Sequence, residues 1–258
     1  MNMSFYSAAV GAEQQQIRLQ VQGNNIANVN TYGYRAEKVS FGELMNMNVR
    51  GIDDAELPKG TGTRVIQAQT DFKTNNGYHE TDRPLDFAIV GDGFFALYDL
   101  ESGEVSFTRD GAFMKARFEV EPAGGGDPVE VWRLSDNEGR CVLNSQGNFI
   151  VLQPDNVMQT TDNPDDRIYR LEDLDIGVFD YAIHEGLQHL DSQRFLPTEK
   201  NGQLYMGTGT IKQGLLEASN TDLALEFVKV IETQRAYGAC LKMMITSDEI
   251  ESTINGLR

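Results

Sequence analysis

Basic residues are scarce in this chain. It holds 22 Lys and Arg against 39 Asp and Glu, which gives a formal net charge of −17 over 258 residues. Such a charge repels the phosphate backbone of nucleic acids and the surface of anionic membranes. We therefore expect no nucleic acid and no membrane surface among its partners.

Cysteine and long apolar runs are also scarce. The two cysteines, Cys141 and Cys240, match neither a disulfide framework nor a metal or redox motif, so we expect two unpaired thiols. No run of about 18 apolar residues occurs, and the first ten residues contain no Lys or Arg. We expect no membrane insertion and no cleavable signal peptide.

Motifs for catalysis or metal binding are missing as well. His184 and His189 are five residues apart, which is wrong for one helical face, so surface positions explain them better than zinc. Gly91 and Gly93 lack the neighbours of a phosphate-binding loop and are expected to form a turn. No nucleophile elbow is found. We expect no enzymatic activity, no metal and no cofactor.

Both ends of the chain have helical patterns with two apolar faces. From Ser4 to about Asn30 there is no proline, and apolar residues recur at helical spacing. Residues 222–257 repeat this design after candidate N-caps at 219–222. One C-terminal stripe holds Leu223, Phe227, Val230, Tyr237, Leu241 and Met244, and a second holds Leu225, Met243, Ile250, Ile254 and Leu257. A helix with two apolar faces needs partners on both sides.

The middle of the chain changes to short runs of β-formers separated by turn residues. Strands are expected at residues 87–90, 94–98, 105–108, 112–118, 129–134, 140–143, 148–152, 168–171, 176–181 and near 194–196. Asp110 and Gly111 are expected to form a hairpin turn. Segments 121–128 and 153–167 are rich in Gly, Pro and Asp and are expected to be loops.

These patterns predict an α+β fold. Two long terminal helices pair as a coiled-coil-like unit, and a mainly antiparallel β domain is inserted between them. The predicted segments are an N-terminal helix at 1–32, an extended linker with β segments at 33–84, a β-rich domain at 85–213 and a C-terminal helix at 214–258. Pairing leaves the second face of each helix for self-association into something larger than a dimer.

Asparagines crowd the end of the first helix, although asparagine is a weak helix former. We hypothesise that Asn25 and Asn28 form hydrogen bonds across closely packed helices of different subunits, as a buried Asn does in a coiled coil. Replacing both with Leu is then expected to spare monomer folding. The predicted assembly interface comprises Phe5, Val10, Ile17, Leu19, Val21, Asn25, Ile26, Asn28, Val29, Leu223, Phe227, Val230, Tyr237, Leu241, Met244, Ile250, Ile254 and Leu257.

Three blocks of sequence resemble bacterial flagellar axial proteins of the rod and hook. Residues 24–34, NNIANVNTYGY, resemble their N-terminal signature. Residues 85–95, LDFAIVGDGFF, and 107–113, FTRDGAF, look like the start of their shared β domain. Residues 214–223, GLLEASNTDL, and 232–237, ETQRAY, are similar to their C-terminal signature. The length resembles rod proteins, of either the distal or the proximal type.

This resemblance implies a structural subunit of the flagellar basal-body rod, needed for motility. Such a subunit is exported by the flagellar type III apparatus, polymerises helically with itself, and meets other rod proteins and hook subunits outside the cytoplasm. Phe41 and Met45 look like the export recognition motif of such substrates, and an ordinary amphipathic turn is the alternative. Other interpretations are a hook or junction component, or a secreted β-rich binding protein or hydrolase.

Overall fold

The computed structural model divides the chain into two compact units. It describes residues 3–44, 47–50, 56–59, 62–120, 129–152, 157–158, 168–169, 174–191 and 193–257. The helical unit comprises Met1–Val29, Ala36–Asp71 and Thr221–Arg258, and the β unit comprises Asn30–Arg35 and Phe72–Asn220. The predicted α+β class, with paired terminal helices and an antiparallel β domain between them, is confirmed.

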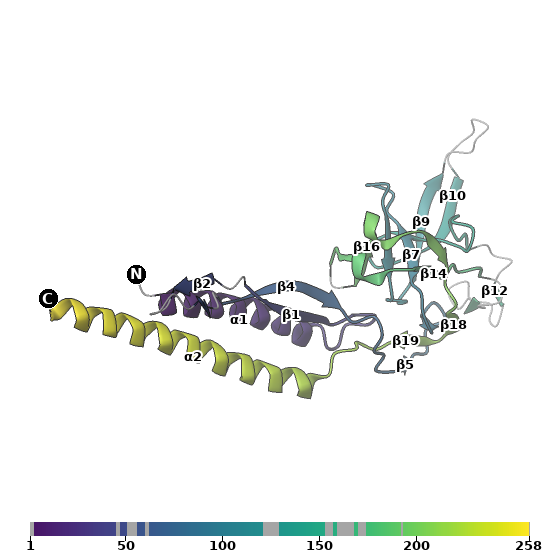
Figure 1. The fold of residues 1–258 in the computed structure, drawn as a ribbon. Coiled ribbons are helices and arrows are strands. Elements are labelled where there is room, and N and C mark those ends of the chain that lie inside the picture. Colours follow the sequence, from purple (N-terminus) through teal and green to yellow (C-terminus); the bar gives the residue numbers. More distant parts are fainter. Residues whose placement is uncertain are drawn as a thin grey trace. The chain divides into compact units, whose positions relative to one another are not determined.

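The helical unit is built on an antiparallel helix pair (Figure 1). Helix α1 spans Met3–Ala27 and helix α2 spans Leu223–Gly256. The N-cap of α2 is Asp222, whose carboxylate accepts hydrogen bonds from the backbone N–H groups of Ala224 and Leu225. These bonds satisfy donors that the first turn of a helix leaves without partners.

Two strand pairs complete the helical unit. Strand β1 (Glu37–Glu43) pairs antiparallel with β4 (Thr63–Thr70), with an irregularity between Ser40 and Phe41. Strand β2 (Met47–Arg50) pairs with β3 (Glu56–Lys59). The backbone N–H of Val65 donates a hydrogen bond of 2.6 Å to Gln14 Oε1, which attaches β4 to α1.

The β unit contains one large antiparallel sheet and several strand pairs. The seven-stranded sheet has the order β15-β16-β8-β7-β11-β10-β9. Its strands are β7 (Phe95–Tyr98), β8 (Val105–Thr108), β9 (Met114–Val120), β10 (Val129–Ser135), β11 (Cys141–Val142), β15 (Gln188–His189) and β16 (Arg194–Leu196). The pairs are β6 (Phe87–Val90) with β18 (Thr210–Gln213), β5 (Tyr78–Glu80) with β19 (Leu215–Glu217), β14 (Phe179–Tyr181) with β17 (Leu204–Met206), and β12 (Val157–Met158) with β13 (Ile168–Tyr169). Two short 3-10 turns occur at His184–Gly186 and Glu199–Asn201.

The hydrophobic core of the β unit consists of two clusters of buried side chains. One gathers Phe87, Phe95 and Phe113 with aliphatic residues of the later strands. The other includes Phe107 and Phe195, both at most 1% exposed. The strands predicted from short apolar runs therefore supply most of this core, because apolar β-forming residues pack well in a buried sheet.

The expected hairpin turn at Asp110 and Gly111 is wrong. Strand β9 pairs with β10, whereas β8 pairs with β7 and β16. Gly111 instead crosses the backbone of Phe87: its carbonyl accepts the Phe87 N–H at 3.0 Å, and a Cβ on Gly111 would lie 1.7 Å from the Phe87 oxygen. Glycine is thus required for close backbone approach and not for a hairpin.

Three further expectations concern residues 148–152, two loops and membrane-spanning helices. Residues 148–152 make isolated bridges, Phe149 with Leu143 and Val151 with Arg133, and no regular strand. The expected loop 121–128 lies outside the described residues, as does most of 153–167. No helix in the described part of the chain combines the length and the hydropathy of a membrane span.

Candidate assembly surface

The two helices meet along a seam of polar and small residues. The fully buried side chains of α2 are Glu226, Thr233 and Ser247, and the half-buried Cys240 continues their seven-residue spacing. A seven-residue repeat keeps one line of side chains on the partner helix. The helices therefore pair as a coiled coil whose buried positions on α2 are polar.

Direct contacts follow this seam from end to end. Gln22 Nε2 donates to Thr233 Oγ1 at 3.1 Å, and the hydroxyls of Ser4 and Ser247 lie 3.0 Å apart. Between them, a Cβ on Gly11 would lie 3.3 Å from Cys240 Sγ. Small side chains allow the two backbones to approach closely, and hydrogen bonds satisfy the buried polar groups.

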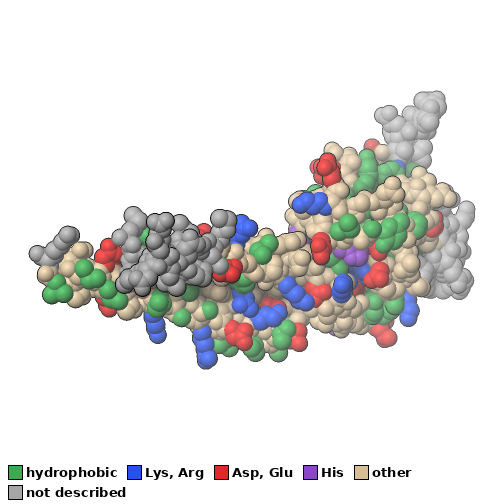
Figure 2. Space-filling view, viewed as in Figure 1, with side chains coloured by type: hydrophobic (Ala, Val, Ile, Leu, Met, Phe, Trp, Pro, Cys, Tyr) green, Lys and Arg blue, Asp and Glu red, His purple; other side chains and the backbone are tan. Residues whose placement is uncertain are grey.

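Apolar side chains of α2 flank the seam or face away from it. Val230, Tyr237 and Met244 are half-buried beside it. Figure 2 shows hydrophobic side chains on the surface of the helical unit. The exposed apolar residues of α2 are Leu223, Leu225, Phe227, Val228, Ile231, Leu241, Met243, Ile245, Ile250, Ile254 and Leu257 just after its end. We call these exposed side chains together the α2 apolar face; they include members of both predicted stripes, so they lie on more than one side of the helix.

The C-terminal end of α2 extends past the described start of α1. Ser247 lies opposite Ser4, and every described residue after Ser247 is exposed. Ile250, Ile254 and Leu257 have relative exposures of 52%, 61% and 84%. Their spacing places them on one side of the helix, where no described part of the chain covers them.

On α1 the predicted interface residues are half-buried. They are Phe5, Val10, Ile17, Leu19, Val21, Ile26 and, after the helix end, Val29. The buried positions of α1 are Ala12, Gln22 and Asn25. Of these, Gln22 lies in the seam, where it bonds to Thr233, and the larger apolar side chains of α1 stay partly in solvent.

Asn25 has a role within one chain that the sequence hypothesis did not include. Its side chain is 1% exposed, its Nδ2 donates to the carbonyl of Glu37 at 2.9 Å, and its Oδ1 accepts the Glu37 N–H at 3.0 Å. The amide thus makes the two backbone hydrogen bonds that a neighbouring strand would make, and it attaches β1 to α1. Asn28 donates to the carbonyl and side-chain oxygens of Asn24. Both amides thus have partners within one chain, and their pairing across subunits stays a prediction.

The candidate export motif is only partly described. Phe41 lies in strand β1, not in a turn, and the guanidinium carbon of Arg18 is 5.8 Å from its ring centre. Met45 lies outside the described residues. The export role of these two residues stays a prediction.

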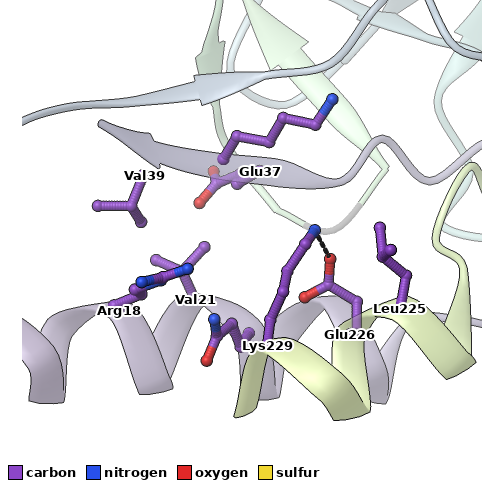
Figure 3. A pocket seen from close by; sticks show the side chains of 9 residues that line it. Arg18, Val21, Glu37, Val39, Leu225, Glu226 and Lys229 are labelled. Atoms are coloured by element: carbon purple, nitrogen blue, oxygen red, sulfur yellow. Dashed lines mark hydrogen bonds and ion pairs between the residues drawn. The ribbon is translucent and has the colours of Figure 1, made fainter. Parts of the chain in front are cut away.

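A partly open pocket lies where α1, β1 and α2 come together (Figure 3). It has a volume of about 350 Å³. Val21, Val39 and Leu225 form apolar walls, and the other lining residues are Arg18, Gln22, Glu37, Lys38, Glu226 and Lys229. Lys229 Nζ bonds to Glu226 Oε1 at 2.6 Å, as Figure 3 shows.

The β unit contains a buried cluster of three charged residues. Glu217 bonds to Arg35 through Oε1 and to Arg109 through Oε2, the latter at 3.2 Å. All three side chains are at most 4% exposed. Arg35 also donates to the carbonyl of Thr74 at 2.6 Å, and Arg109 donates to that of Gly91 at 2.8 Å. Two cations around one carboxylate satisfy charges that are costly to bury alone.

This cluster unites the three sequence blocks quoted above. Arg35 directly follows the first block, Arg109 lies within FTRDGAF, and Glu217 lies within GLLEASNTDL. Gly33 supports the arrangement by donating its N–H to the Glu217 carbonyl at 2.9 Å. Sequence reasoning missed all three charged residues, although charged side chains in or beside the motif blocks were an available signal.

The histidines considered as metal ligands have other neighbours. His184 Nε2 lies 2.6 Å from Asp180 Oδ1, and the ring of His189 lies 4.6 Å from that of Phe195. Among the described residues, no three His, Cys, Asp or Glu side chains come together as metal ligands would.

The chain is similar to known families of flagellar proteins. Residues 5–35 match the family described as "Flagella basal body rod protein", and residues 212–257 match "Flagellar basal body rod FlgEFG protein C-terminal". The flagellar basal-body rod protein FlgG of Bacillus subtilis is 30% identical over 280 residues, covering 100% of both chains. The chain belongs to the flagellar basal-body rod protein family.

Other members of the rod protein family agree with this assignment. The FlgG protein of Agrobacterium fabrum is 27% identical and covers 96% of each chain. The flagellar hook protein FlgE of Borreliella burgdorferi is 34% identical over 158 residues, which are 58% of this chain and 35% of the hook protein. The resemblance to rod proteins seen in the sequence is thereby confirmed.

Proposed function

We propose that this protein is a structural subunit of the flagellar rod that polymerises helically with copies of itself. The observation that carries the proposal is the α2 apolar face, which the described chain leaves exposed. Large exposed apolar patches on a monomer commonly mark surfaces that bind a partner. The family relationship to flagellar basal-body rod proteins supports the rod as the assembly in which copies of the chain meet.

Assembly completes the helical unit in this proposal. At about 25 cal/mol per Å² of buried apolar area, contacts with several neighbours offset the entropy of ordering the helices. The free subunit then holds its helices loosely, and polymerisation and ordering occur together. The subunit reaches its site through the flagellar type III apparatus and acts outside the cytoplasm, beside other rod proteins and hook subunits, without catalysis.

Limited proteolysis tests the coupling of order to assembly. Purified monomer is expected to lose α1 and the end of α2 to protease well before the β unit, whereas both helices resist in the polymer. Equal resistance of helices and β unit in the monomer contradicts the coupling.

A matched pair of variants tests the α2 apolar face. Ile250→Lys with Ile254→Lys places two charges on that face, and Ser252→Lys with Thr253→Lys adds the same charges at exposed polar positions nearby. Only the first pair is expected to abolish polymers seen by electron microscopy.

A strain lacking the protein is expected to build no external hook and to be immotile. A hook that persists in that strain favours a junction component instead.

A further inference from the structure

Three Asn–Gly pairs occur in the chain, at residues 76–77, 201–202 and 255–256. Asparagine is a chemically labile residue, and it is most labile before glycine, which has no side chain to shield its backbone nitrogen. That nitrogen can attack the side-chain amide carbon of the asparagine and close a cyclic imide. The fold decides which pair reacts, because it fixes how freely the two groups can meet.

The pair Asn76–Gly77 lies in an exposed loop of the β unit. Asn76 is exposed, and apart from chain neighbours no described atom lies within 4 Å of the position that a Cβ on Gly77 would take. The Gly77 N–H donates at 2.7 Å to Oδ1 of Asn75, which is itself an exposed side chain. Exposed side chains change rotamer within nanoseconds, so this hydrogen bond opens readily. The Gly77 nitrogen is therefore accessible in the folded protein.

The pair Asn201–Gly202 is held in the opposite way. Asn201 is 0% exposed. Its Oδ1 accepts the Thr198 N–H at 2.6 Å, and its Nδ2 donates to the Ile183 carbonyl at 2.7 Å. Both bonds must break before the amide can turn toward the Gly202 nitrogen, and buried polar groups lose free energy when they lose their partners. The fold therefore protects this pair.

The third pair is held by helical geometry. Asn255 and Gly256 are the last two residues of α2. In an α-helix the backbone N–H of each residue points toward the carbonyl four residues earlier. The Gly256 nitrogen is thus directed along the helix, and ring closure at Asn255 requires the helix end to open first.

We propose that Asn76 is a site of spontaneous deamidation in the folded protein. The Gly77 nitrogen gives its proton to solvent and forms a bond to Cγ of Asn76. The bond from Cγ to Nδ2 breaks, and this nitrogen leaves as ammonia with a proton from solvent. Water then adds to one of the two carbonyl carbons of the cyclic imide. The product is aspartate, or isoaspartate when the main chain comes to run through the former side chain.

Deamidation removes a contact that holds this loop. Asn76 Nδ2 donates to the Ser219 carbonyl at 3.1 Å. A carboxylate only accepts hydrogen bonds, so the product repels that carbonyl where the amide bound it. The Ala218 N–H also donates to the Gly77 carbonyl at 3.1 Å, and the extra main-chain carbon of isoaspartate displaces this bond. The reaction therefore loosens the loop from the segment that precedes α2 in the chain.

Peptide mapping by mass spectrometry tests the site in the full chain. During incubation in mildly alkaline buffer, Asn76 is expected to convert first, Asn255 more slowly, and Asn201 to stay intact. In urea, which removes the fold, Asn76 and Asn201 are expected to convert at similar rates. An Asn76 that stays intact, or that converts no faster than Asn201 in the folded protein, overturns the proposal. Deamidation at Asn76 does not depend on the polymerisation proposed above.

Two matched variants test the consequence for the loop. Asn76→Asp introduces the aspartate product directly and is expected to lower the urea midpoint of the β unit. Asn137→Asp adds the same charge at an exposed turn position and is expected to change the midpoint less. Equal midpoints would overturn the role assigned to the contact between Asn76 and Ser219. Asn76→Gln keeps a side-chain amide but disfavours ring closure, and it is expected to abolish the conversion at this position.

Discussion

Arg35 and Glu217 form a buried ion pair although 182 positions separate them in the sequence. Arg109 binds the other oxygen of the same carboxylate. Glu217 comes from strand β19, close to the end of the β unit in the sequence. The two arginines in the earlier part of the chain thus gain this shared carboxylate only when the late segment is in place.

Glu217→Gln is expected to destabilise the β unit strongly. It removes the carboxylate charge that both guanidinium groups share, and breaking a buried ion pair typically costs about 3–5 kcal/mol. Glu80→Gln, at an exposed position on the partner strand β5, is expected to change the free energy of unfolding by less than about 0.5 kcal/mol. Urea denaturation followed by the fluorescence of Trp132, on strand β10, measures both.

Replacing the whole charged cluster with apolar residues gives a second prediction. Changing Arg35, Arg109 and Glu217 together to methionine removes all three charges, and such apolar replacements are often neutral or stabilising. The triple variant is expected to unfold at a higher urea concentration than Glu217→Gln alone. An equal or lower midpoint would mean that shape, and not charge balance, gives the cluster its importance.

The cluster also marks the limit of what the sequence reveals. Helices α1 and α2 follow from the helical spacing of their apolar residues, and strands β6, β8 and β16 follow from short runs of β-formers. The seam between the helices follows from neither pattern, because Glu226, Thr233 and Ser247 are polar and a search for apolar stripes passes over them. Buried pairs such as Arg35 with Glu217 depend on the path of the chain, which local patterns do not encode.

Gly33→Ala is expected to destabilise the β unit by more than the usual cost of a strained backbone. Gly33 has φ of 68°, and a Cβ there would lie 2.3 Å from the Asp110 nitrogen. Gly147 has a similar φ of 79° but no atom within 4 Å of an added Cβ. Gly147→Ala is therefore the matched control and is expected to cost about 1 kcal/mol. Equal losses in thermal unfolding would show that the close approach at Gly33 contributes nothing.

Asp110 is expected to make the stability of the β unit depend on pH. Burial raises the pKa of its carboxyl to about 6 from an ordinary value of 3.8, and the charges of Asp136 and Asp86 add to the rise, against hydrogen bonds from Ala112 and Gln193. The folded state then binds the proton more tightly than the unfolded state. Its contribution is fully present below about pH 3.8 and is lost as the pH rises through about 6.

Asp110→Asn isolates this contribution. The rise in pKa corresponds to about 3 kcal/mol. Between about pH 4 and pH 7, the unfolding free energy of the unmodified protein is expected to fall by up to that amount relative to the variant. Urea denaturation of both proteins across this range gives the difference at each pH. A difference that stays constant with pH would mean that Asp110 titrates normally in the folded protein.

Asn25→Leu is expected to loosen strand β1 from helix α1 in the monomer. It removes both hydrogen bonds between the Asn25 amide and the Glu37 backbone, at a cost of about 1–3 kcal/mol. Asn28→Leu, at a half-buried position bonded to Asn24, is the control and is expected to cost less. Amide hydrogen exchange at Glu37 measures the change, and protection equal to that of the unmodified protein would contradict the role assigned to Asn25.

The division of the chain has a mechanical consequence. The backbone passes between the two units four times, after Val29, Arg35, Asp71 and Asn220. A load applied across the units is therefore shared by four covalent strands in parallel, and each carries only part of it. The first two of these strands bound a short segment, Asn30–Arg35, whose Gly33 and Arg35 are bonded to Glu217 inside the β unit. A shaft subunit built in this way resists separation of its two units through its covalent chain.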